Sequence, residues 1–68
     1  MTRDPRKNPK AGDITLSDCG AELRITRVKE GVVYYTSSKA RDKGILIILL
    51  EDWVRLSSKH DTVVHVED

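Results

Sequence analysis

One thiol and two imidazoles are the side chains of this sequence best suited to act as a nucleophile, a base or a metal ligand. Cys19 is the single cysteine, and His60 and His65 are the two histidines. A cysteine nucleophile also needs an orienting group and an oxyanion site, and Asp18 and Gly20 flank Cys19 as turn residues do. The histidine spacing fits half of a zinc finger, but a pair of cysteines is missing. We therefore expect no catalytic residue and no metal site.

Paired carboxylates and glycine-rich phosphate-binding loops are two other features that often mark an enzyme active site. Glu51 and Asp52 are adjacent. Adjacent side chains point to different sides of a strand or helix, so these two carboxylates cannot act together on one bond of a substrate. The four glycines are scattered at turns and form no phosphate-binding motif. The sequence predicts a protein that is not an enzyme and needs no cofactor.

Basic side chains occur in two places where they could meet phosphate groups, at the start of the chain and in a later loop. They are Arg6, Lys7, Lys10, Lys39, Arg41 and Lys43. An exposed Tyr34 could stack on a base beside them. The net charge is only +1, whereas a dedicated nucleic-acid-binding domain carries a clear excess of basic residues. Nucleic-acid binding is therefore the alternative function, and solvated surface charge explains the same residues.

The length of 68 residues corresponds to one small domain. Such a domain buries about 60% of the surface that its unfolded chain exposes, so an enclosed catalytic pocket is hard to build. The apolar run 45–50 is far shorter than the roughly 20 residues that cross a bilayer, and no hydrophobic segment follows the charged N-terminus. A lone cysteine cannot form an internal disulfide. We expect a cytoplasmic protein without a membrane segment.

The two ends of the chain differ in composition. Residues 1–10 contain both prolines, four cations and almost no apolar side chain, which predicts a flexible basic arm that folding does not need. The other end carries Asp61, Glu67 and Asp68, with no cation after Lys59. This asymmetry fits either a charge dipole along the molecule or solubilising tails on a small barrel.

Alternation of apolar and polar residues predicts three short strands, over 14–16, 21–28 and 32–36. The alternation slips by one residue near 26–27, which predicts a β-bulge there. Residues 29–31 read as a three-residue hairpin loop with a glycine at positive φ. In the returning strand, Val33 and Tyr35 are predicted to face the core and Tyr34 to face solvent.

Residues 45–56 fit both a helical spacing and, in their β-branched first part, a buried strand. We predict a strand over 45–49, where β-branched residues dominate, and one short helical turn over 50–56. Glu51 and Asp52 suit the positive N-terminal end of that turn. Residues 62–66 are either a last strand or an extension that orders only on a partner.

These elements predict a mainly β fold. The expected architecture is a small antiparallel SH3-like or partly open β-barrel over residues 11–57, between the basic arm 1–10 and a C-terminal extension 58–68. No predicted helix is long enough to cross between parallel strands, so the sheet is expected to be antiparallel.

Apolar residues exceed what one small barrel can bury. The surplus is the run 45–50, which is apolar on both faces if extended, and the residues expected to self-associate are Ile45, Ile47, Leu49, Val64 and Val66. A barrel has an interior for only one face of each strand. Either the extension folds back over the surplus or a second copy covers it. We predict a homodimer in which a basic arm approaches an acidic tail across a two-fold axis.

Three segments carry a resemblance to a known group. They are the opening N-P-K-A-G-D at 8–13, the strand R-I-T-R-V at 24–28 and the strand G-V-V-Y-Y at 31–35. Together with a short helix containing Trp53, this pattern resembles small proteins encoded by tailed phages and prophages, from Asp4 to Leu56. The resemblance implies a compact β fold and a location in the cytoplasm of a bacterial host. It implies no reaction and no catalytic residue.

A small fold without catalytic residues is expected to act by occupying a surface. Exposed strands offer backbone groups that another protein can pair with. We therefore predict a protein-binding module of a phage or prophage. Its partner would be a host or phage protein, such as a host enzyme or defence complex that it inhibits.

Overall fold

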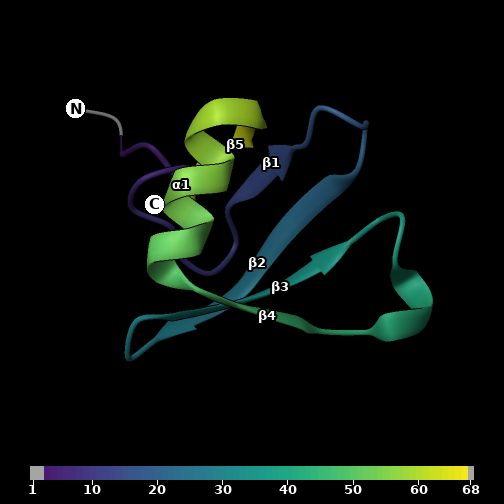
Figure 1. Cartoon of the computed structure of the whole chain (residues 1–68), viewed down its shortest axis with the longest axis horizontal. Helices are drawn as coiled ribbons and strands as arrows, with labels where there is room; N and C mark the ends of the chain where they lie inside the picture. The colour runs from purple at the N-terminus through teal and green to yellow at the C-terminus, as the bar shows by residue number, and fades with distance from the viewer. Residues whose placement is uncertain (1–2, 68) are drawn as a thin grey trace.

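The computed structural model describes residues 3–67, which form five strands and one α-helix (Figure 1). The elements are β1 (Ile14–Leu16), β2 (Glu22–Lys29), β3 (Val32–Ser37), a 3₁₀ turn η1 (Arg41–Lys43), β4 (Leu46–Leu49), α1 (Leu50–His60) and β5 (Thr62–His65). The strands form one antiparallel sheet in the order β4-β3-β2-β1-β5. The predicted mainly β, antiparallel and partly open fold is confirmed, and β4 and β5 are the two edges of the sheet.

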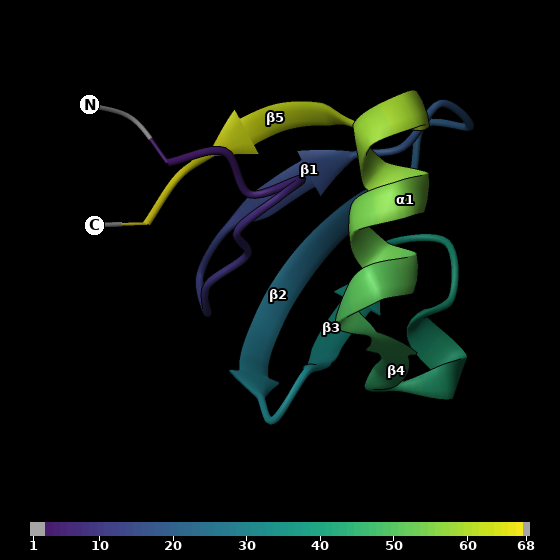
Figure 2. The same cartoon turned by 60° about the vertical axis from the view of Figure 1, so that its left-hand side comes forward.

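Helix α1 packs against one face of this sheet (Figure 2). Trp53 on the helix is only 2% exposed and packs on Ile25 and Val33, which are also buried. The ring of Tyr35 lies 5.5 Å from that of Trp53, measured between centroids. Val33 and Tyr35 thus face the core, as alternation predicts, and Tyr34 lies on the opposite face.

The hairpin between β2 and β3 contains the predicted bulge and a shorter loop than predicted. The pairing register shifts between Ile25 and Arg27, which confirms the bulge. Lys29 remains in β2, so the loop has two residues, Glu30 and Gly31, with φ of 52° and 74°. Two consecutive positive φ values are typical of a type I′ turn, whose twist matches that of the strands.

The helix is longer than the predicted turn over 50–56, because it continues to His60. Ser57 lies one helical turn after Trp53, on the same side of the helix, and is buried at 2% exposure. The buried side of the helix therefore continues past residue 56. The predicted boundary between residues 57 and 58 therefore falls inside α1.

The C-terminal extension is part of the sheet. Strand β5 pairs with β1, which settles the choice that the sequence left open for residues 62–66. Because β5 and β4 lie at opposite edges of the sheet, the extension does not cover the apolar residues of β4.

Residues 3–10 pack against the rest of the protein, which differs from the predicted free arm. Pro5 is fully buried, and its carbonyl accepts a hydrogen bond of 3.0 Å from Nε1 of Trp53. The expectation that this segment adds nothing to the core is wrong at Pro5. A proline ring is apolar and has no N–H to satisfy, so it can be buried under the indole at little cost. Residues 1–2 and 68 of the predicted arm and tail lie outside the described residues.

The two ends of the chain meet at Asp13, the last residue of the N-P-x-x-G-D segment. Its carboxylate is fully buried and accepts hydrogen bonds from the Arg3 guanidinium and from the backbone N–H groups of Lys10 and Glu67. A Cβ at Gly12, whose φ is 97°, would lie 2.9 Å from Cγ of Glu67. Within residues 3–67, the basic and acidic segments are therefore neighbours at Asp13 and do not lie at opposite ends of the molecule.

Candidate functional site

The face of β2, β3 and β4 that α1 leaves uncovered is called the outer face here. Strand pairing places the side chains of alternate residues on it. These are Glu22, Arg24, Arg27, Lys29, Val32, Tyr34, Thr36, Ile47 and Leu49. The outer face has an apolar half along β4 and a polar half at the end of the β2–β3 pair.

The apolar half is a row of exposed aliphatic side chains. Ile45, Ile47 and Leu49 are 59%, 66% and 51% exposed. Ile47 pairs with Tyr34 of β3, and Leu49 pairs with Val32. Three of the five residues predicted to self-associate are thus brought together, and we call Ile45, Ile47 and Leu49 the β4 row.

The other two predicted self-association residues lie elsewhere. Val64 is 56% exposed on β5, and Val66 is half-buried just after that strand. Because β5 is the far edge of the sheet, these valines are not part of the β4 row.

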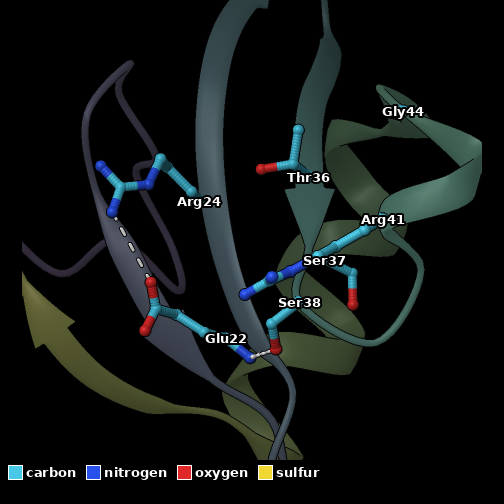
Figure 3. A pocket seen from close by; sticks show the side chains of 7 residues that line it. All are labelled: Glu22, Arg24, Thr36, Ser37, Ser38, Arg41 and Gly44. Atoms are coloured by element: carbon cyan, nitrogen blue, oxygen red, sulfur yellow. Dashed lines mark hydrogen bonds and ion pairs between the residues drawn. The ribbon is translucent and has the colours of Figure 1, made fainter.

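The polar half contains an open pocket of about 330 Å³ (Figure 3). It is lined by Glu22, Arg24, Thr36, Ser37, Ser38, Arg41 and Gly44. Figure 3 shows Arg41 extending from η1 toward Ser38 and Glu22, whereas Arg24 lies on the other side of Glu22. Arg24 and Glu22 form an ion pair of 3.6 Å, and Ser38 Oγ accepts a hydrogen bond of 2.8 Å from the Glu22 N–H. Guanidinium and hydroxyl groups are donors that suit a carboxylate or phosphate.

Tyr34 is less exposed than predicted. It is half-buried, and the guanidinium carbon of Arg27 lies 6.0 Å from the centroid of its ring. The bulge in β2 produces this contact, because it sets Arg27 directly opposite Tyr34. Part of one ring face is therefore covered within the chain, and Arg27 was missed because the sequence indicated the bulge but not the register after it.

The predicted basic residues do not form a single surface. In both views residues 3–10 and η1 lie on opposite sides of the molecule (Figures 1 and 2). Arg6 is half-buried, pairs with Asp4 at 3.1 Å and donates to the carbonyl of Asp61. Lys7 and Lys10 are exposed.

The loop cations of the prediction also differ in their surroundings. Lys39 donates to the carbonyl of Cys19, and Lys43 is exposed on η1. Arg41 alone among the six predicted basic residues lines the pocket. Its neighbours Arg24 and Thr36 were missed, although strand alternation places both on one face once β2 and β3 are paired.

The thiol and the imidazoles lie at the surface. Cys19 is exposed in the turn before β2, and a hydrogen bond with Ser17 lowers the pKa of its thiol. His60 lies 3.4 Å from Asp18, and His65 lies 2.8 Å from Glu67. Within residues 3–67, no three His, Cys, Asp or Glu side chains form a group that could hold a metal ion.

Comparisons with known proteins assign neither a family nor a function to this chain. No protein-family model, curated protein or solved structure matches this chain. In the described part of the chain, the longest helix is α1, and it lacks the length and apolar character needed to span a bilayer. The surface chemistry of the outer face is therefore the basis for a functional proposal.

Proposed function

We propose that this chain is a small non-enzymatic accessory protein of a phage or prophage that binds another protein through its outer face. The β4 row supports this proposal, because its three aliphatic side chains are each more than half exposed. Burying one such side chain is worth about 1.5–3 kcal/mol. A domain of this size has a stability of only about 3–5 kcal/mol, so an exposed row is costly unless a partner covers it.

The chemistry of the outer face defines the kind of partner. The β4 row offers apolar contacts, and Tyr34 beside it offers a large ring with a polar end. The neighbouring pocket offers Arg24 and Arg41 to an acidic group. Tyrosine and arginine are enriched among the residues that dominate binding energy. The preferred partner is a protein with an apolar anchor next to a carboxylate, and we place it among host enzymes and defence complexes of the bacterial cytoplasm.

Capture from bacterial host lysate with the immobilised full chain tests this proposal. Ile47→Lys puts a charge at the centre of the β4 row and should abolish capture of the partner. Val64→Lys is the matched control, because Val64 is also exposed in an edge strand, at 56% against 66% for Ile47. The proposal fails if no protein is retained, or if Ile47→Lys retains the same proteins as the wild type.

Nucleic-acid binding is a second candidate, supported by the two arginines and three hydroxyl groups of the pocket. In this case affinity should fall steeply as salt rises, by a slope of roughly 0.9 per phosphate contacted on a double-logarithmic plot. Arg41→Ala and Tyr34→Ala should weaken binding, whereas Lys59→Ala, an exposed residue of α1, should not. A gel-shift assay with mixed-sequence DNA and RNA measures this. Absence of any shift at low salt removes this candidate.

A further inference from the structure

Strand β4 has a free backbone edge. The N–H of Leu50 donates to the carbonyl of Gly31 at 2.8 Å. In an antiparallel ladder every second residue directs its N–H and C=O to the same neighbour, so Leu46 and Ile48 also bond to β3. Ile47 and Leu49 therefore direct their backbone groups away from β3, to a side where no strand of residues 3–67 pairs.

This edge is only four residues long, but it lacks the sequence features that normally keep edge strands from pairing. Proteins protect such edges with charges, prolines or bulges. The run from Ile45 to Leu50 contains no charge and no proline, and the β3–β4 register has no shift. The opposite edge, β5, is different, because its pairing with β1 is irregular and it ends in the exposed His65.

We propose that a second copy of this chain pairs with β4, antiparallel, with Ile47 on the two-fold axis opposite its own counterpart. Ile45 then lies opposite Leu49 of the other copy, and the outward backbone groups of both strands meet. A shift of two residues in one direction would leave Leu49 beyond the start of the other β4, near Lys43 of η1. A shift of two residues in the other direction would leave Ile45 beyond the end of the other β4, near Glu51 of α1. Among these neighbouring registers, the central one alone pairs every member of the β4 row with an apolar residue.

Charges at the two ends of β4 favour the same arrangement. Lys43 lies in η1 just before β4, and Glu51 lies in the first turn of α1 just after it. The antiparallel pairing therefore brings the basic side chain before one β4 toward the acidic side chain after the other, twice. Neither side chain has a hydrogen-bond or ion-pair partner within residues 3–67. Asp42 of η1 and Asp52 of α1 flank the same ends and have like charge, but Asp52 is already bonded to Arg55 at 2.9 Å.

The pairing extends the proposed function without depending on it. It joins two five-stranded sheets through their backbone edges, and a two-fold axis perpendicular to the sheet keeps both outer faces on one side. The two β4 rows then lie side by side as one apolar platform. This arrangement differs from the dimer expected from the sequence, because the basic and acidic ends of each chain already contact each other at Asp13.

Light scattering coupled to size exclusion, at low and high micromolar concentration, tests the pairing. The wild type should have twice the 7.7 kDa mass of one chain. Ile47→Lys and Ile47→Glu should each be monomeric, because like charges meet on the axis, and an equal mixture of the two should recover the dimer. Val64→Lys should stay dimeric. A monomeric wild type or a dimeric Ile47→Lys overturns the pairing, and failure of the mixture to recombine overturns this register.

A second measurement uses the wild type alone and does not rely on folding of a variant. The amide of Ile47 should exchange with solvent slowly when the chain is concentrated and rapidly when it is dilute. Equal exchange at both concentrations overturns the pairing. Neither measurement includes another protein. A negative result therefore overturns the pairing of two copies and leaves the proposed binding of a partner protein to the lysate capture.

Discussion

The guanidinium of Arg3 binds the buried carboxylate of Asp13 through both of its terminal nitrogens, with Nη2 at 2.8 Å from Oδ1. Burial alone would raise the pKa of Asp13. The hydrogen bonds from Arg3 and from the N–H groups of Glu67 and Lys10 outweigh burial, so the pKa of Asp13 lies below its ordinary value. This carboxylate thus holds both ends of the chain against β1 and β2.

Arg3→Ala should destabilise the fold strongly. The substitution leaves a buried carboxylate without its cation, which costs about 3 kcal/mol or more. Urea unfolding at neutral pH measures the loss, and Arg24→Ala, which removes an exposed ion pair, should change stability by less than about 1 kcal/mol.

The same variant should change the response to acid. Because the folded pKa of Asp13 is lowered, its contribution to stability is present above the unfolded pKa and is lost as pH falls through the folded pKa. Arg3→Ala should therefore unfold at a higher pH than the wild type in an acid titration. Equal acid midpoints would contradict the role assigned to this pair.

Asp61→Asn should raise stability at neutral pH. Burial raises the pKa of Asp61 above the ordinary 3.8, and a negative charge is also unfavourable at the C-terminal end of α1. A raised folded pKa means that stability is greatest below the unfolded pKa and is lost as pH rises through the folded pKa. The asparagine can still accept the hydrogen bond from Thr15.

Thermal unfolding at two pH values measures this effect. The melting temperature of Asp61→Asn should exceed that of the wild type at neutral pH, and the gap should close below the unfolded pKa, where Asp61 is protonated. Asp42→Asn, at an exposed carboxylate of η1, serves as the control. A variant less stable than the wild type at neutral pH would show that the Asp61 charge is favourable.

Glu30→Asn should stabilise the β2–β3 hairpin. Glu30 has φ of 52°, a conformation that costs most L-residues roughly 1 kcal/mol and that asparagine tolerates. Asn-Gly is also the preferred pair for a type I′ turn. Urea unfolding should show a gain of up to about 1 kcal/mol, whereas Lys29→Asn, inside β2, should lower stability.

Deletion of residues 1–10 should lower the melting temperature sharply. It removes the Arg3 cation and leaves the buried indole N–H of Trp53 without the carbonyl of Pro5, a loss of about 1–3 kcal/mol for the hydrogen bond alone. Tryptophan fluorescence should shift to longer wavelength as water reaches Trp53. Deleting only residues 1–2 keeps both contacts and is the control, and an unchanged melting temperature for the full deletion would contradict this role.

The local features of this fold could be read from the sequence. Alternation located β1, β2 and β3, and its slip located the bulge, because side-chain direction along a strand depends only on neighbouring residues. The start of α1 agreed with Glu51 and Asp52, because acidic side chains are favourable at the positive N-terminal end of a helix. The apolar surplus at Ile45, Ile47 and Leu49 was also visible, because the run 45–50 is apolar on both faces and a small barrel buries only one face of a strand.

Only the tertiary structure decided which distant groups meet. Trp53 finds its acceptor at Pro5, 48 residues away, and Asp13 receives the N–H of Glu67 across 54 residues. The composition of residues 1–10 suggested a free arm. Composition gives the polarity of the side chains, but it does not show which groups form hydrogen bonds with each other in the folded chain. The pocket of Arg24, Thr36 and Arg41 likewise exists only because β2, β3 and η1 are placed side by side. Pairing between distant segments fixes these contacts, and hydrophobic patterning within a segment carries no information about them.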